Sequence, residues 1–189
     1  EVLRLYADHN YTLNGAFTSR AARDPQREFI CFNGKSWTWQ TFGVAVECSA
    51  RLFVARGVRK GDRVGVMARN CDGHVLVLLA LARIGAIMVP VNPEFGVQEA
   101  KYVFHHAEVS AVLAASDTLA VARQAAAGLA LPPWFALFDE AKDNVPLLRE
   151  LAASAPQVAL PGDITADDTV LIVYTSGTTG FPKGAMHSQ

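Results

Sequence analysis

Apolar side chains recur along this chain with two periods, one typical of helices and one typical of strands. The helical period appears in residues 13–23 and again in 41–56, where Phe42, Val46 and Ala50 share one face. The same reasoning predicts strands at 63–68, 86–89, 110–114, 134–138 and 169–174, and helices at 72–84, 97–106, 117–127 and 146–153. The repeated order of strand and helix predicts an α/β fold, with a largely parallel sheet flanked by helices on both faces.

A small N-terminal hairpin is expected before this alternation begins. Two strand-like runs flank Asn33-Gly34, the second of them at 36–39. Asparagine and glycine both accept the positive φ that a tight hairpin turn needs. Trp37 and Trp39 are expected on one face of the second strand, where packing against a helix is favoured over stacking on a nucleic-acid base.

Shifts in composition divide the chain into three parts. Residues 1–130 form the predicted α/β core, 131–168 are rich in small residues and proline and read as an excursion or linker, and 169–189 hold the last strand and a loop. The chain starts at Glu1 and stops at Gln189 without closing turn signals. We therefore expect the incomplete N-terminal part of a longer enzyme domain, with the C-terminal domain absent.

The most informative stretch follows the last strand. From Tyr174 to Gly184 the chain carries glycines, hydroxyl side chains and a lysine at the carboxyl end of a buried strand, where ligands of parallel sheets bind. Close backbone amides, hydroxyls and an ammonium suit a polyphosphate. The candidate residues are Thr175, Ser176, Gly177, Thr178, Thr179, Gly180 and Lys183. The pattern is not a Walker A loop, because Lys183 follows proline. The alternative is a glycine-rich hairpin that only reverses the chain.

Composition and charge exclude several classes of protein. The chain is 51% hydrophobic and 19% charged with net charge -1, which argues against disorder and against broad attraction to nucleic acid. The longest apolar run, 75–82, is too short for a transmembrane segment. Cys31, Cys48 and Cys71 form no metal-type cluster, so a cytoplasmic location is expected. Cys71 is interpreted as a small core residue rather than a reactive thiol.

The run Tyr-Thr-Ser-Gly-Thr-Thr-Gly-Phe-Pro-Lys-Gly at 174–184 resembles the AMP-binding signature of the adenylate-forming superfamily. That superfamily contains acyl-CoA synthetases, adenylation domains of peptide synthetases and beetle luciferases. Upstream resemblances to its N-terminal region are Gly57-Val58, Gly61-Asp62-Arg63-Val64, Asn70, Gly85-Ala86 and Pro90-Val91-Asn92-Pro93. One position departs: the family commonly has a histidine where this chain has Gln189, and His187 lies two residues earlier. Any substrate-side role at that position is therefore in doubt.

The resemblance implies an acid–thiol ligase of the acyl-CoA synthetase type. Such an enzyme activates a fatty or aryl carboxylic acid with ATP to an acyl-adenylate and then forms a thioester with coenzyme A. It implies that Thr175 to Gly180 and Lys183 hold the β- and γ-phosphates, that Thr175 helps to place Mg²⁺, and that Lys183 is catalytic. The implied cofactors and co-substrates are ATP, Mg²⁺ and coenzyme A, and the implied partner is a small carboxylic acid. A homodimer is left open.

Two alternatives remain beside this reading. The first is an adenylation domain that loads a carrier protein, and the second is a nucleotide-binding module without catalysis. The family's later motifs and its C-terminal lysine are not located in residues 1–189. We therefore expect this chain alone to be inactive or nearly so.

Overall fold

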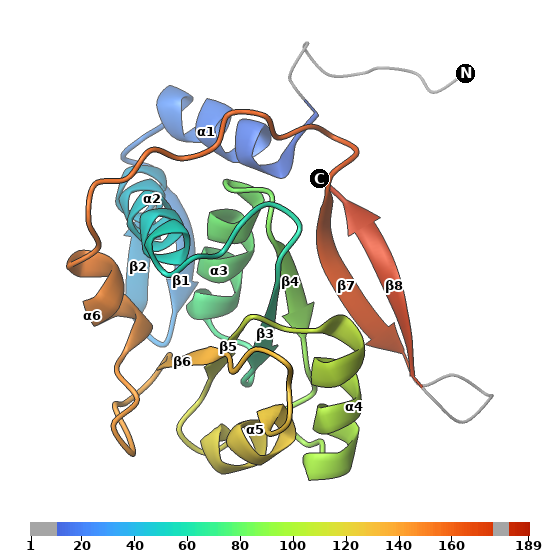
Figure 1. Cartoon of the computed structure of the whole chain (residues 1–189). Coiled ribbons are helices and arrows are strands. Elements are labelled where there is room, and N and C mark those ends of the chain that lie inside the picture. The colour runs from blue at the N-terminus through green and yellow to red at the C-terminus, as the bar shows by residue number, and fades with distance from the viewer. Residues whose placement is uncertain (1–10, 176–181) are drawn as a thin grey trace.

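The computed structural model describes residues 11–175 and 182–189 of the chain. Within these residues lies a six-stranded sheet of order β6-β5-β3-β4-β7-β8 (Figure 1). All neighbouring strands are parallel except β8, which runs antiparallel to β7. The strands are β3 (Arg63–Met67), β4 (Ile87–Pro90), β5 (Ala111–Ala114), β6 (Trp134–Leu137), β7 (Thr169–Thr175) and β8 (Lys183–Ser188). The largely parallel α/β sheet is confirmed, and β8 is a strand that the sequence pattern did not predict.

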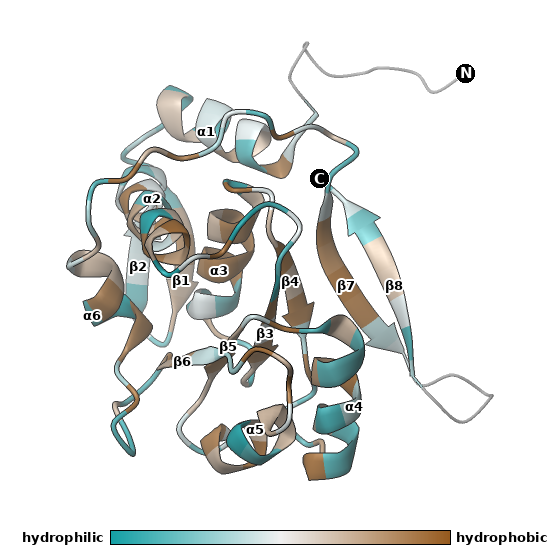
Figure 2. Cartoon of the chain, viewed as in Figure 1, coloured by the Kyte–Doolittle hydropathy of each residue, from teal (hydrophilic) through white to brown (hydrophobic). Residues whose placement is uncertain are grey.

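Helices cover both faces of this sheet. The described helices are α1 (Leu13–Arg23), α2 (Trp39–Ala55), α3 (Asp72–Ala82), α4 (Val97–Ala107), α5 (Leu119–Ala126) and α6 (Leu148–Ala153). Buried side chains of α1, α2, α3 and α6 belong to one core cluster, and those of α4 and α5 belong to another. Successive residues of β3 alternate between them, because Val64 and Val66 join the first cluster and Met67 joins the second. Figure 2 shows the corresponding apolar strands between the two layers of helices.

The N-terminal hairpin forms as predicted, but its second strand begins and ends one residue earlier than expected. Strands β1 (Glu28–Phe32) and β2 (Lys35–Thr38) pair antiparallel around Asn33 and Gly34, whose φ angles are 49° and 75°. Thr38 ends β2 and caps α2 through a capping box, so Trp39 is the first helical residue. The prediction that Trp37 and Trp39 share a strand face is therefore wrong. The two rings nevertheless pack in one aromatic cluster with Phe42 and its neighbours.

The segment at 131–168 contributes to the sheet as well as to the surface. Strand β6 forms one edge of the sheet beside β5, and α6 packs against α2. Past α6, the chain returns beside α1 (Figure 1). Just before β7, the Asp168 carboxylate binds the ammonium of Lys60, in the loop between α2 and β3, at 2.8 Å. This return brings the chain to β7, on the far side of β4.

Asp139 ties the end of β6 to the loop after β5, and this contact predicts a pH dependence. Its carboxylate accepts hydrogen bonds from the Ser116 backbone amide at 2.9 Å and the Ser116 hydroxyl at 2.7 Å. Burial pushes the pKa of this carboxyl up, but the Ser116 and backbone hydrogen bonds outweigh it and hold the pKa below its usual range. The ionised form is favoured in the fold. This contribution to stability is present above about pH 4 and is lost as pH falls through the lowered pKa.

Asp139→Asn should therefore flatten the acid side of the stability curve. Melting temperatures measured between about pH 6 and pH 3 should fall less steeply in the variant than in the parent protein. Asp143→Asn is the matched control, since Asp143 is an exposed aspartate of the same segment whose backbone carbonyl, not its carboxylate, is bound by Arg123. Identical slopes for Asp139→Asn and the parent would contradict the assignment.

Candidate functional site

Thr175 and Lys183 lie opposite each other at the end of the β7–β8 pair. Thr175 is the last residue of β7, Lys183 is the first of β8, and the two are cross-strand partners. Both side chains are exposed. Because β7 runs parallel to β4, this end of the pair is at the carboxyl edge of the parallel sheet. A hydroxyl and an ammonium therefore stand side by side at the edge where ligands of such sheets bind.

The rest of the predicted phosphate-binding loop is not covered by the structure. Ser176, Gly177, Thr178, Thr179 and Gly180 lie outside the described residues. Of the seven candidate residues, the structure therefore places Thr175 and Lys183 and brings them together. The chain does reverse at this point, since β8 returns antiparallel to β7. Phosphate binding and chain reversal are thus compatible readings of the same turn.

Gly184 gives the β7–β8 pair its local shape. It pairs with Tyr174, and a Cβ added at Gly184 would lie 2.9 Å from Ile172 Cγ2 and 3.2 Å from Tyr174 Cζ. Those distances are too short for a side chain, so the Tyr174 ring occupies the space that a larger residue would need. Lys183 thus provides an exposed cation, and Gly184 leaves room for the ring of Tyr174 on the neighbouring strand.

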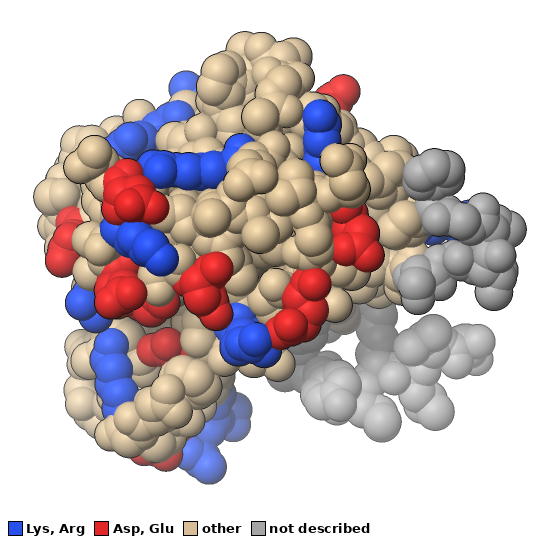
Figure 3. Space-filling model, turned by 90° about the horizontal axis from the view of Figure 1, so that it is seen from below, with Lys and Arg blue, Asp and Glu red and all other residues tan. Residues whose placement is uncertain are grey.

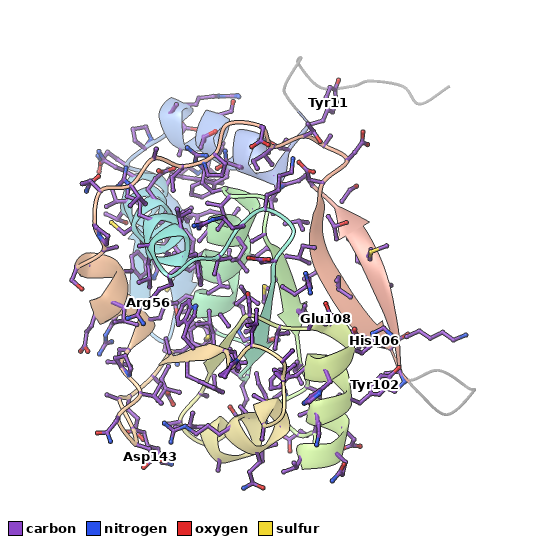
Figure 4. All side chains as sticks on the ribbon, viewed as in Figure 1. Tyr11, Arg56, Tyr102, His106, Glu108 and Asp143 are labelled. Carbon is purple, nitrogen blue, oxygen red and sulfur yellow. The ribbon has the colours of Figure 1, made fainter. Side chains whose placement is uncertain are left out.

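Helix α4 contacts the chain on both sides of this turn. The Tyr174 hydroxyl and His106 Nδ1 share a hydrogen bond of 2.7 Å, and the Tyr102 hydroxyl donates to the Pro182 carbonyl at 3.1 Å. The Tyr102 and His106 rings stack at 5.5 Å, and each meets the Tyr174 ring edge to face. Tyr102 and His106 project from α4 toward β7 and β8 in Figure 4. Burial raises the pKa of Tyr174, and the nearby Tyr102 adds to the effect. Its hydroxyl therefore stays neutral at physiological pH.

Sequence reasoning missed both α4 residues. His105 and His106 are adjacent, and adjacent residues on a helix point in different directions, so the sequence favours surface or packing roles for both. The structure separates them: His105 Nε2 lies 3.1 Å from the Ala127 carbonyl, while His106 turns to Tyr174. The available signal was the spacing of Tyr102 and His106, four residues apart on one helix face. Their partner could not be read from the sequence, because it lies 68 residues further along.

The carboxyl edge of the sheet carries charges of both signs. Seen from below, Lys and Arg are interspersed with Asp and Glu rather than gathered in one basic field (Figure 3). Arg69, just after β3, is paired with Glu94, just after β4, at 2.5 Å. Attraction of an anion to this edge therefore has to be local. Among the residues placed at the turn, Lys183 is the cation in position to supply it.

A hollow at the carboxyl edge of the sheet holds Cys71. It measures about 500 Å³ and lies between the loop after β3, the loop after β5 and the end of β6. The Cys71 sulfur is 3.5 Å from His74 Nδ1. Burial raises the pKa of Cys71 and lowers that of His74, so the thiol and the neutral imidazole are favoured over an ion pair. This environment supports the reading of Cys71 as an unreactive thiol.

Comparison with known proteins identifies the group to which this arrangement belongs. A family model described as AMP-binding enzyme matches residues 17–189. The chain belongs to this family. The matched region includes residues 174–184, and the adenylate-forming resemblance inferred from them is confirmed.

Named relatives agree with this membership. The chain is 32% identical over 158 residues to crotonobetaine/carnitine–CoA ligase of Salmonella paratyphi A, covering 80% of this chain and 30% of that protein. It is 27% identical over 180 residues to surfactin synthase subunit 1 of Bacillus subtilis, covering 93% of this chain and 5% of that one. A solved Rhodopseudomonas palustris structure, assigned as a long-chain-fatty-acid CoA ligase, matches with TM-score 0.86 and 27% identity over 96% of this chain and 45% of that one. The chain thus spans less than half of each relative.

Gln189 has a structural role at the position where the family commonly has histidine. Its side-chain oxygen accepts from the Leu13 amide at 3.2 Å, and its side-chain nitrogen donates to the Ala82 carbonyl at 3.0 Å. Gln189 therefore joins the start of α1 to the end of α3. His187, two residues earlier, is exposed on β8.

The donor set at the turn fits a magnesium ion only in part. Thr175 offers one neutral oxygen, and oxygen is the ligand that Mg²⁺ prefers. Across residues 11–175 and 182–189, no group of three His, Cys, Asp or Glu side chains could hold a metal ion. Of the helices in the same ranges, none is long and apolar enough to cross a membrane.

Proposed function

We propose that this protein activates a carboxylic acid with ATP and then forms a thioester with coenzyme A. The observation that carries the proposal is the pairing of Thr175 with Lys183 at the carboxyl end of β7, within a chain of the AMP-binding family. CoA ligases among its relatives support coenzyme A as the acceptor. The acid is a small-molecule substrate.

The chemistry requires two anions to approach each other. A carboxylate oxygen attacks the α-phosphorus of ATP, the bond to pyrophosphate breaks, and an acyl-adenylate forms. The Lys183 ammonium lowers the repulsion and stabilises negative charge on the leaving pyrophosphate. Thr175 donates its hydroxyl beside it, and we assign Ser176, Gly177, Thr178, Thr179 and Gly180 to the β- and γ-phosphates. When bound, Mg²⁺ supplies further positive charge to the phosphates, with Thr175 as one oxygen ligand.

A carrier-loading adenylation domain is the second candidate. The match to surfactin synthase subunit 1 extends over 93% of this chain and favours it. Both candidates share the first half-reaction and differ in the acceptor thiol. A cytoplasmic location and a homodimer stay predictions from the sequence.

The test is ATP–pyrophosphate exchange by the full-length protein over a panel of fatty, aryl and trimethylammonium-bearing carboxylic acids. We expect at least one acid to support exchange, and added coenzyme A to yield the acyl-CoA. Transfer to a phosphopantetheinylated carrier protein instead would establish the second candidate. Binding of MgATP without exchange for any acid would contradict both and leave a nucleotide-binding module.

A further inference from the structure

The chain on each side of the phosphate-binding turn is attached to the same helix. Tyr174, one residue before Thr175, shares its hydrogen bond with His106. Pro182, one residue before Lys183, accepts its hydrogen bond from Tyr102. Tyr102 and His106 are one helical turn apart on α4, and their rings stack. A single rigid surface thus touches both ends of the turn next to the two proposed phosphate ligands.

We propose that Tyr102 and His106 are positioning residues that set the geometry of Thr175 and Lys183 for ATP. This inference rests on the proposed function. Neither α4 residue needs to touch the nucleotide. They act through the residues that precede Thr175 and Lys183, and we call Tyr102, His106, Tyr174 and Pro182 the α4 clamp.

The surroundings of the hairpin explain why such a clamp is needed. Within the described residues, strand β8 lies at the edge of the sheet and its residues 183–188 are exposed. Beside its pairing with β7, the start of β8 is linked to α4 through Pro182, whose carbonyl accepts the Tyr102 hydrogen bond. An edge hairpin held only by its own ladder can twist and fray. Contacts from a packed helix oppose this motion where a ligand residue must be held in place.

Helix α4 is packed into the core on one side, so it can hold Tyr102 and His106 in fixed positions. Val103 and Phe104, between the two clamp residues in sequence, are fully buried in the second core cluster. The helix therefore presents Tyr102 and His106 on one side while its other side is packed on the sheet. Positioning by a rigid element is more accurate than positioning by a loop.

The test removes hydrogen bonds while keeping the rings. Tyr102→Phe removes the donor to Pro182, and Tyr174→Phe removes the partner of His106 while its ring still covers Gly184. Each loses one neutral hydrogen bond, so we expect KM for MgATP in ATP–pyrophosphate exchange to rise roughly fivefold, with KM for the acid unchanged. Backbone amides of residues 183–188 should exchange faster with deuterium. His106→Gln, which keeps a hydrogen-bonding side chain, should retain more ATP affinity than His106→Ala.

His105→Gln is the matched control, because this adjacent histidine on the same helix bonds toward Ala127 and not toward the hairpin. It should leave KM for MgATP and the exchange of 183–188 unchanged. Parent-like exchange of 183–188 in both phenylalanine variants would overturn the clamp. Faster exchange with an unchanged KM for MgATP would overturn its positioning role.

Lys183→Ala separates failure of this inference from failure of the proposed function. If Lys183→Ala impairs ATP use and the clamp variants do not, the inference fails and the proposed function stands. If the parent protein shows no ATP–pyrophosphate exchange with any acid, the proposed function fails and the inference fails with it. If the parent shows exchange and Lys183→Ala leaves it intact, Lys183 is not a phosphate ligand and the inference alone fails. If Lys183→Ala impairs ATP use and the clamp variants raise KM for MgATP, both are supported.

Discussion

Lys183→Ala should reduce kcat/KM for acid activation by the full-length protein about 100- to 1,000-fold. The basis is the removal of a positive charge beside phosphates that gain negative charge as pyrophosphate leaves. Thioester formation from supplied acyl-adenylate should fall much less, since no pyrophosphate leaves in that half-reaction. ATP–pyrophosphate exchange and thioester formation, measured separately on the same preparation, check this difference.

The same variant should fold normally. Lys183 is exposed at the start of an edge strand, and surface substitutions of this kind usually change stability by less than about 0.5 kcal/mol. Lys101→Ala, an exposed lysine of α4, is the matched control and should leave both half-reactions unchanged. Equal losses in the two half-reactions would argue against a phosphate role for Lys183.

Local patterns predicted most of the fold because each helix or strand has its own periodicity and stop signals. The turn at Asn33 and Gly34 and the carboxyl-edge position of Thr175 follow from such local rules. Strand β8 was missed because Lys183–Ser188 is exposed along its whole length and has no buried alternation to reveal a strand. The sequence analysis placed Trp39 in a strand because aromatic residues favour strands. In the structure, the Thr38 cap starts helix α2 at Trp39.

The same distinction between local patterns and long-range contacts applies to the candidate site. Thr175 and Lys183 could be predicted because they belong to a contiguous motif. Tyr102 and His106 could not, since their hydrogen-bond partners lie 80 and 68 residues further along the chain. Long-range contacts of this kind depend on how α4 sits on the sheet, which local sequence does not specify. That seating depends on a particular contact in the core.

Gly65 and Phe104 make that contact, and changing either should destabilise the protein strongly. A Cβ added at Gly65, in the centre of β3, would lie 2.8 Å from Phe104 Cε1 on α4. Gly65→Ala must therefore displace a fully buried ring, at a cost of about 1–3 kcal/mol. Phe104→Ala should cost about 3–5 kcal/mol, because it leaves a cavity between helix and sheet. Chemical denaturation of single variants measures both, and Gly162→Ala is the matched control, since nothing lies within 4 Å of a Cβ there.

A double-mutant cycle decides whether the two residues act as one contact. Phe104→Leu removes the ring atom that a Gly65 side chain would meet, so Gly65→Ala should cost less in the Phe104→Leu background than in the parent. Coupling of at least about 0.5 kcal/mol is expected for residues in direct contact. Strict additivity would show that Gly65→Ala acts elsewhere in the sheet. Because the same helix carries Tyr102 and His106, Gly65→Ala should also raise KM for MgATP, while Gly162→Ala should not. That result would connect the choice of glycine in β3 to the geometry of Thr175 on β7 and Lys183 on β8.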